Sequence, residues 1–433
     1  MLAGFITALL LLLIVMGMPI AFAMAVAGGV GIVLIGGKET ILYTLGTYPV
    51  SRAGTFSLTT IPLFILMGNL ASAAGIATDA FIVASKWLGR LKGGLVMVTI
   101  GACGLFAATT GSSLAEAAAV GKIVIPEMKK RGYDMKLAAG SVACAGTLGI
   151  LIPPSISLVI YGVVAGESIG KLFVAGILPG LLTIILYMAM VYVRVTVNPK
   201  IAPKTEWVNW RERARSLTKA WGVLLLFLTV IGGLYAGVAT PSQIGALGCF
   251  VALCLVLLGI VQGKSSWASL KRAIMETGDL CAMIFAFIIG AGLYSLFITM
   301  SQVVPWLVEM TSHLPVSNLG MLIVILFFYI PLGMFFDPLA MILVTVPIIH
   351  PIVVQGLGYD SIWFGIVLVK MIEISLITPP LGLNLYVITG LFPDISSEMV
   401  LAGSSWFLVM EVLTIATLIA FPSIVTWLPN MMG

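Results

Sequence analysis

The segment TLGILIPPS, residues 147–155, lies within a stretch, 137–166, that contains no charged residue. About 20 helical residues cross the apolar core of a bilayer, so this stretch is long enough to span one. Pro153 and Pro154 cannot donate backbone hydrogen bonds, and they interrupt the helix. Polar backbone at membrane depth is tolerated only where it is buried in protein or lines a cavity. The segment therefore predicts a membrane helix that is broken beside a binding site.

The composition also indicates a membrane protein. Hydrophobic residues make up 60% of the 433-residue chain and charged residues only 9%, whereas soluble proteins average about 25% charged residues. This excludes an ordinary soluble enzyme, a disordered chain and a nucleic-acid-binding protein. The five cysteines lie in apolar stretches without a CxxC pair, which predicts buried thiols rather than disulfides or a metal site. Because HExxH, GxSxG and P-loop motifs are missing from the sequence, we predict no enzyme and no ATP-binding site.

Apolar stretches predict five membrane crossings in each half of the chain. They lie near 2–17, 19–36, 56–77, 137–166, 172–193, two within 220–263, 280–300, 361–390 and 400–428. Two more apolar segments, 93–126 and 316–356, are interrupted near their middles, and we interpret each as a re-entrant helical hairpin. The stretches 38–54 and 264–279 are predicted to lie at the membrane surface.

Basic residues predict the orientation of these segments, because Lys and Arg concentrate in cytoplasmic loops. Cations flank segment 93–126 on both sides and recur in the loops 194–219 and 264–272. These loops are therefore predicted to be cytoplasmic. Segment 316–356 lacks basic flanks, so both of its ends are predicted to lie outside. With five crossings in each half, both chain termini are also predicted to be outside.

An internal repeat relates the two halves at a spacing of 226 residues. Gly132-Tyr-Asp134 recurs as Gly358-Tyr-Asp360, and Pro153-Pro154 recurs as Pro379-Pro380. The predicted elements recur in the same order. Each copy crosses the membrane an odd number of times, so the second copy must be inverted. Inverted repeats with discontinuous helices place transport sites near the bilayer midplane.

Four interrupted segments carry the chemistry of the predicted site. They are the hairpin turns 109–113 (TTGSS) and 331–338 (PLGMFFDP), and the broken helices at 147–155 and 378–382 (TPPLG). Free carbonyls together with Ser or Thr hydroxyls form an all-oxygen shell that suits Na+. Helix N-termini beginning at Ser112 or Asp337 carry partial positive charge and favour an anionic substrate group.

Charged residues at membrane depth are functional by default. Asp337 precedes a proline at a hairpin turn, where helix capping and ion or substrate coupling are both open. Lys370 and Glu373 lie three residues apart on one helix face and are predicted to form a structural ion pair. Glu116 either caps the helix start one turn before it or takes a direct part in the site. Glu411 is left without an assigned role.

These segments resemble the large membrane subunit of TRAP (tripartite ATP-independent periplasmic) transporters. The matching motifs are TGSSLAEAAAVG (110–121), IPPSI (152–156), DPLA (337–340) and ITPPLG (377–382), in order along essentially the whole chain. The resemblance implies Na+-coupled import of a small organic acid anion, such as a C4-dicarboxylate or sialic acid, across the bacterial inner membrane. The partners it implies are a small four-helix membrane subunit and a periplasmic substrate-binding protein. Na+ is the coupling ion, and no organic cofactor is expected.

The resemblance also implies an elevator mechanism, in which the hairpins and broken helices move across a static scaffold. The scaffold is predicted to comprise 1–92, 171–315 and 396–433, and the transport segments 93–170 and 316–395. The residues expected to bind two Na+ ions are Ser112, Ser113, Gly149 and Pro154 for the first ion, and Gly333, Asp337, Thr378 and Pro380 for the second. Substrate contacts are expected at Thr110, Ser155, Gly382 and Asn384. The alternative is a single-component Na+/carboxylate carrier that needs no binding protein.

Overall fold

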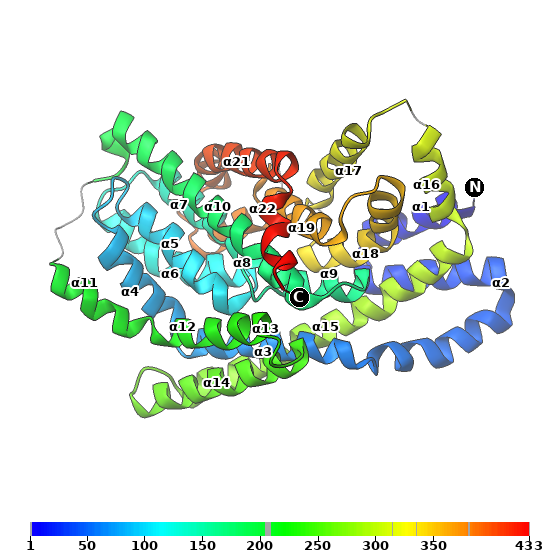
Figure 1. Ribbon diagram of the computed structural model, residues 1–433, viewed down its shortest axis with the longest axis horizontal. Helices are drawn as coiled ribbons and strands as arrows, with labels where there is room; N and C mark the ends of the chain where they lie inside the picture. The colour runs from blue at the N-terminus through cyan, green and yellow to red at the C-terminus, as the bar shows by residue number, and fades with distance from the viewer. Residues whose placement is uncertain (1, 204–208, 314, 335, 380–381, 433) are drawn as a thin grey trace.

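The computed structural model describes residues 2–203, 209–313, 315–334, 336–379 and 382–432, and its regular secondary structure is helical (Figure 1). Seven of the described helices are long and apolar enough to cross a membrane, and two bent helix pairs raise the number to nine. The predicted all-α polytopic membrane fold is therefore confirmed.

The first half of the chain contains the helices before the first hairpin, the hairpin itself, the first broken helix and the helix after it. They are α1 (Leu2–Val15), α2 (Ile20–Ala53), α3 (Thr60–Ala73), α4 (Ile76–Leu88), α5 (Leu95–Thr110), α6 (Ser113–Lys130), α7 (Met135–Ala145), α8 (Leu148–Leu151), α9 (Ile156–Ala165) and α10 (Ile169–Val197). The predicted break at the proline pair is confirmed, because α7–α8 and α9 meet at an angle of 41°.

The second half follows the short helix α11 (Trp210–Ser216). Its helices are α12 (Trp221–Phe227), a π-helical turn (Leu228–Gly232), α13 (Gly233–Tyr235), α14 (Pro241–Val261), α15 (Trp267–Met300), α16 (Val303–His313), α17 (Asn318–Leu332), α18 (Pro338–Pro351), α19 (Ser361–Ile377), α20 (Leu383–Leu391), α21 (Ser397–Ala420) and α22 (Ser423–Asn430). The helices α4, α11 and α16 were not predicted, and the predicted crossing 400–428 is divided between α21 and α22.

One predicted boundary is confirmed and another is wrong. The backbone of Gly37 is not helical (φ 81°, ψ 177°) and interrupts α2, so the residues from 38 to 53 form a separate helical segment, as predicted. Their position at the membrane surface stays a prediction. Residues 267–279, in contrast, belong to α15, a helix of 34 residues that runs on into the predicted crossing at 280–300. The charged residues in this second stretch do not end a helix.

The recurring Gly-Tyr-Asp triplet has the same local structure in both halves. Gly132 and Gly358 adopt the left-handed conformation, with φ of 75° and 77°. Asp134 accepts hydrogen bonds from the backbone nitrogens at the start of α7, and Asp360 does the same for α19. In each triplet the glycine provides the turn before a broken helix, and the aspartate caps the start of that helix.

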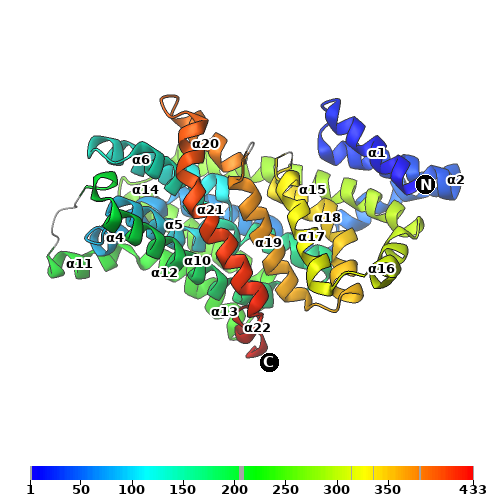
Figure 2. The ribbon, with the colours of Figure 1, turned by 90° about the horizontal axis from the view of Figure 1, so that it is seen from above.

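The helices are arranged in two parts. The long helices α2, α3, α14 and α15 run side by side along one edge of the molecule, and the hairpins and broken helices lie together beside them (Figure 1). Helix α21 lies against α7, α10, α19 and α20, and it leads into α22 at the C-terminus (Figure 2).

Contacts between the two halves are reciprocal. Helix α2 packs along α15, while α14, the counterpart of α2, packs along α3, the counterpart of α15. In the same way α18 packs on α9, and α6 packs on α20. Glycines allow the close approach: a methyl group on Gly28 would lie 2.6 Å from the backbone nitrogen of Tyr294, and one on Gly245 would lie 3.1 Å from the Cβ atom of Leu63. These reciprocal contacts support an internal repeat. The inverted orientation of its two copies stays a prediction.

Candidate transport site

The first hairpin turns at Gly111, and this turn packs directly onto the break in the first broken helix. Gly111 has a left-handed backbone (φ 65°), which glycine adopts without strain. A methyl group added to it would lie 2.7 Å from the carbonyl oxygen of Pro154 and 3.0 Å from the backbone nitrogen of Ile156. The two interrupted backbones are therefore in contact, with no side chain between them.

Gly149, in α8, brings further backbone to the same place. A methyl group on Gly149 would overlap the carboxyl group of Glu116 and would lie 3.3 Å from the carbonyl oxygen of Ser112. Ser113 begins α6 and is only 2% exposed. The structure thus gathers the residues predicted for the first ion around one hairpin turn. Binding of Na+ by them stays a prediction.

Glu116 lies in this contact and is completely buried. No backbone N–H group of the described residues donates a hydrogen bond to its carboxyl oxygens. A capping carboxylate would accept a hydrogen bond from a backbone N–H of the first turn, so the capping interpretation of Glu116 is wrong. Because Glu116 lies beside Gly149 and Ser112, the other interpretation, a direct part in the site, stays a prediction.

The residues predicted to contact substrate in the first half have hydrogen-bond partners within the chain. The Thr110 hydroxyl donates to the carbonyl of Phe106 at 3.4 Å. The Ser155 hydroxyl donates to the carbonyl of Ile150 and accepts from the backbone N–H of Leu158 at 3.3 Å, so it caps α9. Substrate contact by Thr110 or Ser155 stays a prediction.

The second hairpin places Asp337 at the N-cap of α18. One carboxylate oxygen accepts from the backbone N–H groups of Leu339 at 2.9 Å and Ala340 at 3.2 Å. The capping interpretation is confirmed, and a further role in ion or substrate coupling is untested. Gly333 ends the other arm: a methyl group there would overlap the Ser375 side chain and lie 3.2 Å from the Ser375 carbonyl carbon. The second hairpin therefore also packs against its broken helix.

The second broken helix separates where α19 ends at Ile377 and α20 begins at Leu383. The Thr378 hydroxyl donates to the carbonyl of Ile374 at 2.5 Å, and its backbone N–H donates to the carbonyl of Ser375 at 3.3 Å. Pro380, predicted as a ligand of the second ion, lies outside the described residues. Thr378 therefore lies at the C-terminal end of α19, where Gly333 lies against Ser375.

Gly382 and Asn384, the other predicted substrate contacts, are buried beside neighbouring helices. A methyl group on Gly382 would overlap the carbonyl oxygen of Leu376. The side-chain nitrogen of Asn384 donates to the carbonyl of Ala143 at 3.0 Å and so joins α20 to α7. The Asn384 side-chain oxygen is buried without a hydrogen-bond partner among the described residues. Substrate binding by Gly382 or Asn384 is untested.

A buried charge cluster joins α19 to α10 and α21. The Lys370 ammonium lies 2.7 Å from a Glu373 carboxylate oxygen, which confirms the predicted ion pair. It also lies 2.6 Å from a Glu411 oxygen, and it donates to the Thr183 hydroxyl at 3.0 Å. The Tyr187 hydroxyl donates to the other Glu411 oxygen. Sequence reasoning missed the role of Glu411, because it lies 41 positions after Lys370 in the sequence and only the fold brings the two side chains into contact.

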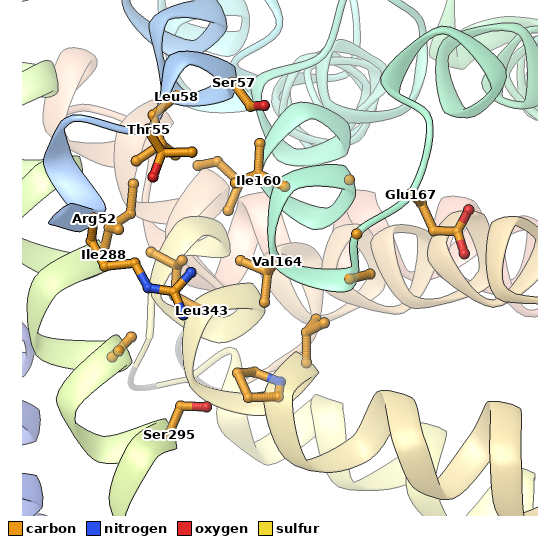
Figure 3. Close-up of a pocket in the computed structure, with 18 of the residues that line it drawn as sticks. Arg52, Thr55, Ser57, Leu58, Ile160, Val164, Glu167, Ile288, Ser295 and Leu343 are labelled. Atoms are coloured by element: carbon orange, nitrogen blue, oxygen red, sulfur yellow. The ribbon is translucent and has the colours of Figure 1, made fainter. Parts of the chain in front are cut away.

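A separate cavity of about 700 Å³ lies between the two parts of the molecule. Its walls come from the end of α2, the loop that follows it, the end of α9, the middle of α15 and the end of α18. The Arg52 guanidinium points into it, while the Glu167 carboxylate points away (Figure 3). Thr55, Ser57 and Ser295 add hydroxyl groups to the lining. The predicted ion and substrate residues that are described lie elsewhere, so this cavity was not foreseen.

Two hairpin turns packed against two broken helices, within a bundle of apolar spans, are the architecture of a secondary transporter. The chain belongs to the DctM component family of tripartite ATP-independent periplasmic transporters, whose family model matches residues 7–424. It is therefore the large permease subunit of such a system, a multi-pass protein of the bacterial inner membrane, as its sequence predicts. Its relatives are transporter permeases, which agrees with the prediction that it is not an enzyme.

Two relatives and one solved structure illustrate these similarities. The C4-dicarboxylate TRAP transporter large permease protein DctM of Pseudomonas aeruginosa is 36% identical over 380 residues, covering 87% of each chain. The isethionate TRAP transporter permease protein DctMQ of Oleidesulfovibrio alaskensis is 33% identical over 88% of this chain and 59% of that protein. The crystal structure of the YdaH transporter of Alcanivorax borkumensis matches over 90% of both chains with a TM-score of 0.64 and 14% identity, which shows a shared fold.

Proposed function

We propose that this permease imports a small organic acid anion by coupling its movement to an inward flow of Na+. The observation that carries the proposal is the backbone contact of the Gly111 turn with the Pro154–Ile156 segment, together with the contact of Gly333 with the end of α19. Contacts of this kind leave carbonyl oxygens and hydroxyls in a confined, buried space. That environment suits a small hard cation, which binds through oxygen ligands.

Each half contributes one ion site in this proposal. The first Na+ lies between the Ser112–Ser113 turn and the carbonyls near Gly149 and Pro154. The second lies between Gly333 and the turn that begins at Thr378. Ion binding holds each hairpin against its broken helix, so the pocket forms only when Na+ is present. This order of events links substrate binding to Na+.

The substrate anion lies between the two hairpin turns. Helices α6 and α18 begin at these turns, and a helix N-terminus carries about half a positive charge. Both helix starts therefore attract a carboxylate, and Asp337 occupies the cap of one of them. The curated relatives named above are described as carriers of C4-dicarboxylates and isethionate, which are organic acid anions. We assign this substrate class to the present chain.

The elevator movement occurs between the two parts of the molecule. Helices α2, α3, α14 and α15 form the static part. Helix α10 packs on α5, α9 and α19, and α21 packs on α7 and α19. We therefore assign α10 and α21 to the moving part, although the sequence-based division grouped them with the scaffold.

The 700 Å³ cavity is the outer entrance in this scheme. Most cations are predicted to lie on the cytoplasmic side, whereas Arg52 falls on the predicted outer face. No ion pair joins it to a carboxylate within the described part of the chain. Its guanidinium is thus available to a carboxylate that enters between the static and moving parts, and both chain termini lie on this periplasmic side.

Reconstitution in proteoliposomes tests this function. The full chain is reconstituted with its small membrane subunit, with or without the periplasmic binding protein, and uptake of a labelled C4-dicarboxylate is measured. We expect uptake that requires an inward Na+ gradient and the binding protein. Equal uptake with a K+ gradient would contradict Na+ coupling. Rapid Na+-driven uptake by the large chain alone would favour the alternative, a single-component carrier.

A further inference from the structure

The cluster around Lys370 contains one positive charge and two carboxyl groups, all with side chains that are 0% exposed. Lys370 and Glu373 lie on α19, and Glu411 lies on α21. Each carboxyl group approaches the same ammonium, at 2.7 Å and 2.6 Å. If both carboxyl groups were ionised, the cluster would carry one net negative charge inside the protein. An unpaired buried charge is strongly destabilising.

The hydrogen bonds of the cluster show the same imbalance. The Lys370 ammonium has three N–H groups, and its neighbours are the two carboxyl groups and the Thr183 hydroxyl. One Glu373 oxygen is buried without a hydrogen-bond partner among the described residues. The Glu411 oxygen nearest Lys370 lies 2.6 Å from the ammonium, so the two carboxyl groups and the Thr183 hydroxyl together occupy its three N–H groups. No N–H group is left for the remaining Glu373 oxygen.

Neighbouring helices supply no second cation to this cluster in the described residues. The titratable groups that act on it are Tyr187 on α10, Cys144 on α7 and Glu116 on α6. Tyr187 donates its hydroxyl hydrogen to Glu411 and carries no positive charge. Glu116 adds a further acidic group. The missing positive charge must therefore come from a bound ion.

We propose that the Glu373–Glu411 pair is a proton-binding site, in which the two carboxyl groups share one proton beside Lys370. A proton fits better than Na+, because the Lys370 ammonium and the Tyr187 hydroxyl already contact the two Glu411 oxygens, and the ammonium also contacts Glu373. Closely coupled carboxyl groups titrate as a pair, so the proton belongs to both. The bound proton makes the contact of α19 with α10 and α21 electrically neutral. None of the residues of this site is one of the proposed Na+ ligands.

Infrared spectroscopy of the full chain with its small subunit in lipid nanodiscs tests the proposal directly. Protonated carboxyl groups and carboxylates absorb at different frequencies, and transfer to D2O shifts the protonated carboxyl band but leaves the lipid ester band in place. Glu411→Gln and Glu373→Gln each leave one carboxylate balanced by Lys370. In each case we expect the difference spectrum from wild type to show the loss of one protonated carboxyl group per chain, with the carboxylate band unchanged.

Lys370→Gln is the opposite test. Without the ammonium, both carboxyl groups become neutral, and we expect one more protonated carboxyl group per chain than in wild type. A loss of carboxylate absorption in Glu411→Gln, with no change in the protonated band, would overturn the proposal, because it would mean that both groups are ionised in wild type. Because Glu→Gln preserves side-chain shape, these two variants remain informative even if Lys370→Gln does not fold.

Discussion

Replacing Gly111 with alanine tests the contact on which the first ion site is built. The left-handed conformation costs a non-glycine residue about 1–2 kcal/mol. In addition, the new methyl group would meet backbone atoms of Pro154 and Ile156 at 2.7 Å and 3.0 Å, and overpacking of this kind costs about 1–3 kcal/mol. Backbone atoms cannot rotate away as a flexible side chain can. The alanine must therefore push the hairpin turn away from the broken helix.

Gly132→Ala is the matched control. Gly132 has a similar φ of 75°, but a methyl group there meets no atom within 4 Å. The two variants share the conformational penalty, so their difference isolates the contact with Pro154 and Ile156. That difference of about 1–3 kcal/mol corresponds to a change of about 5- to 150-fold in an equilibrium constant.

The assay is uptake by reconstituted transporter as a function of Na+ concentration, with thermal unfolding measured in parallel. We expect Gly111→Ala to raise the Na+ concentration for half-maximal uptake about 5- to 150-fold relative to Gly132→Ala, and to unfold at a lower temperature. If the two variants show the same Na+ dependence and the same unfolding temperature, the hairpin turn does not rest on the broken helix, and the reasoning is refuted.

Three further predictions concern the proposed ion, substrate and entrance residues. Asp337→Asn should retain the cap of α18, whereas Asp337→Ala should lower the free energy of unfolding by about 1 kcal/mol. Both variants should abolish uptake if the charge has a coupling role. Full uptake by Asp337→Asn would limit the residue to capping. Ser113→Ala and Thr378→Ala should each raise the Na+ concentration for half-maximal uptake, and unchanged Na+ dependence in both would remove the proposed sites. Arg52→Gln should raise the half-saturating substrate concentration about fivefold, since an accessible charge pair contributes up to about 1 kcal/mol. Arg52→Lys should raise this concentration less. Equal values for wild type and Arg52→Gln would exclude Arg52 from the entrance.

The sequence predicts the interrupted elements well, because their signals are local. Glycine at a turn, an aspartate cap and a proline pair each act within a few residues. Gly111 lies at the predicted hairpin turn, Asp337 caps α18, which is one of its two predicted roles, and the helix breaks at the proline pair 153–154. Helix continuity was harder to predict. Charged residues in the first turns of α15 indicate a surface, yet helix propensity there is high, and the helix runs unbroken to Met300.

Contacts between distant segments could not be predicted from local signals. Glu411 gives no indication in the sequence that it shares the ammonium of Lys370, and the cavity around Arg52 requires four separate helices to meet. Glu116 was open to two interpretations, because a glutamate in the first helical turn is typical of a cap. The lack of a hydrogen bond from the first turn excludes the cap, and the packing against Gly149 places the carboxyl group in the site.

The reciprocal helix pairing has a consequence for biosynthesis. Helix α2 enters the membrane early, but its partner α15 ends at Met300. Until the ribosome has produced that helix, the surface around Gly28 has only lipid beside it. Truncated chains that stop before α15 should therefore be recognised as unassembled and degraded, whereas chains that extend past it can complete the pair of α2 with α15.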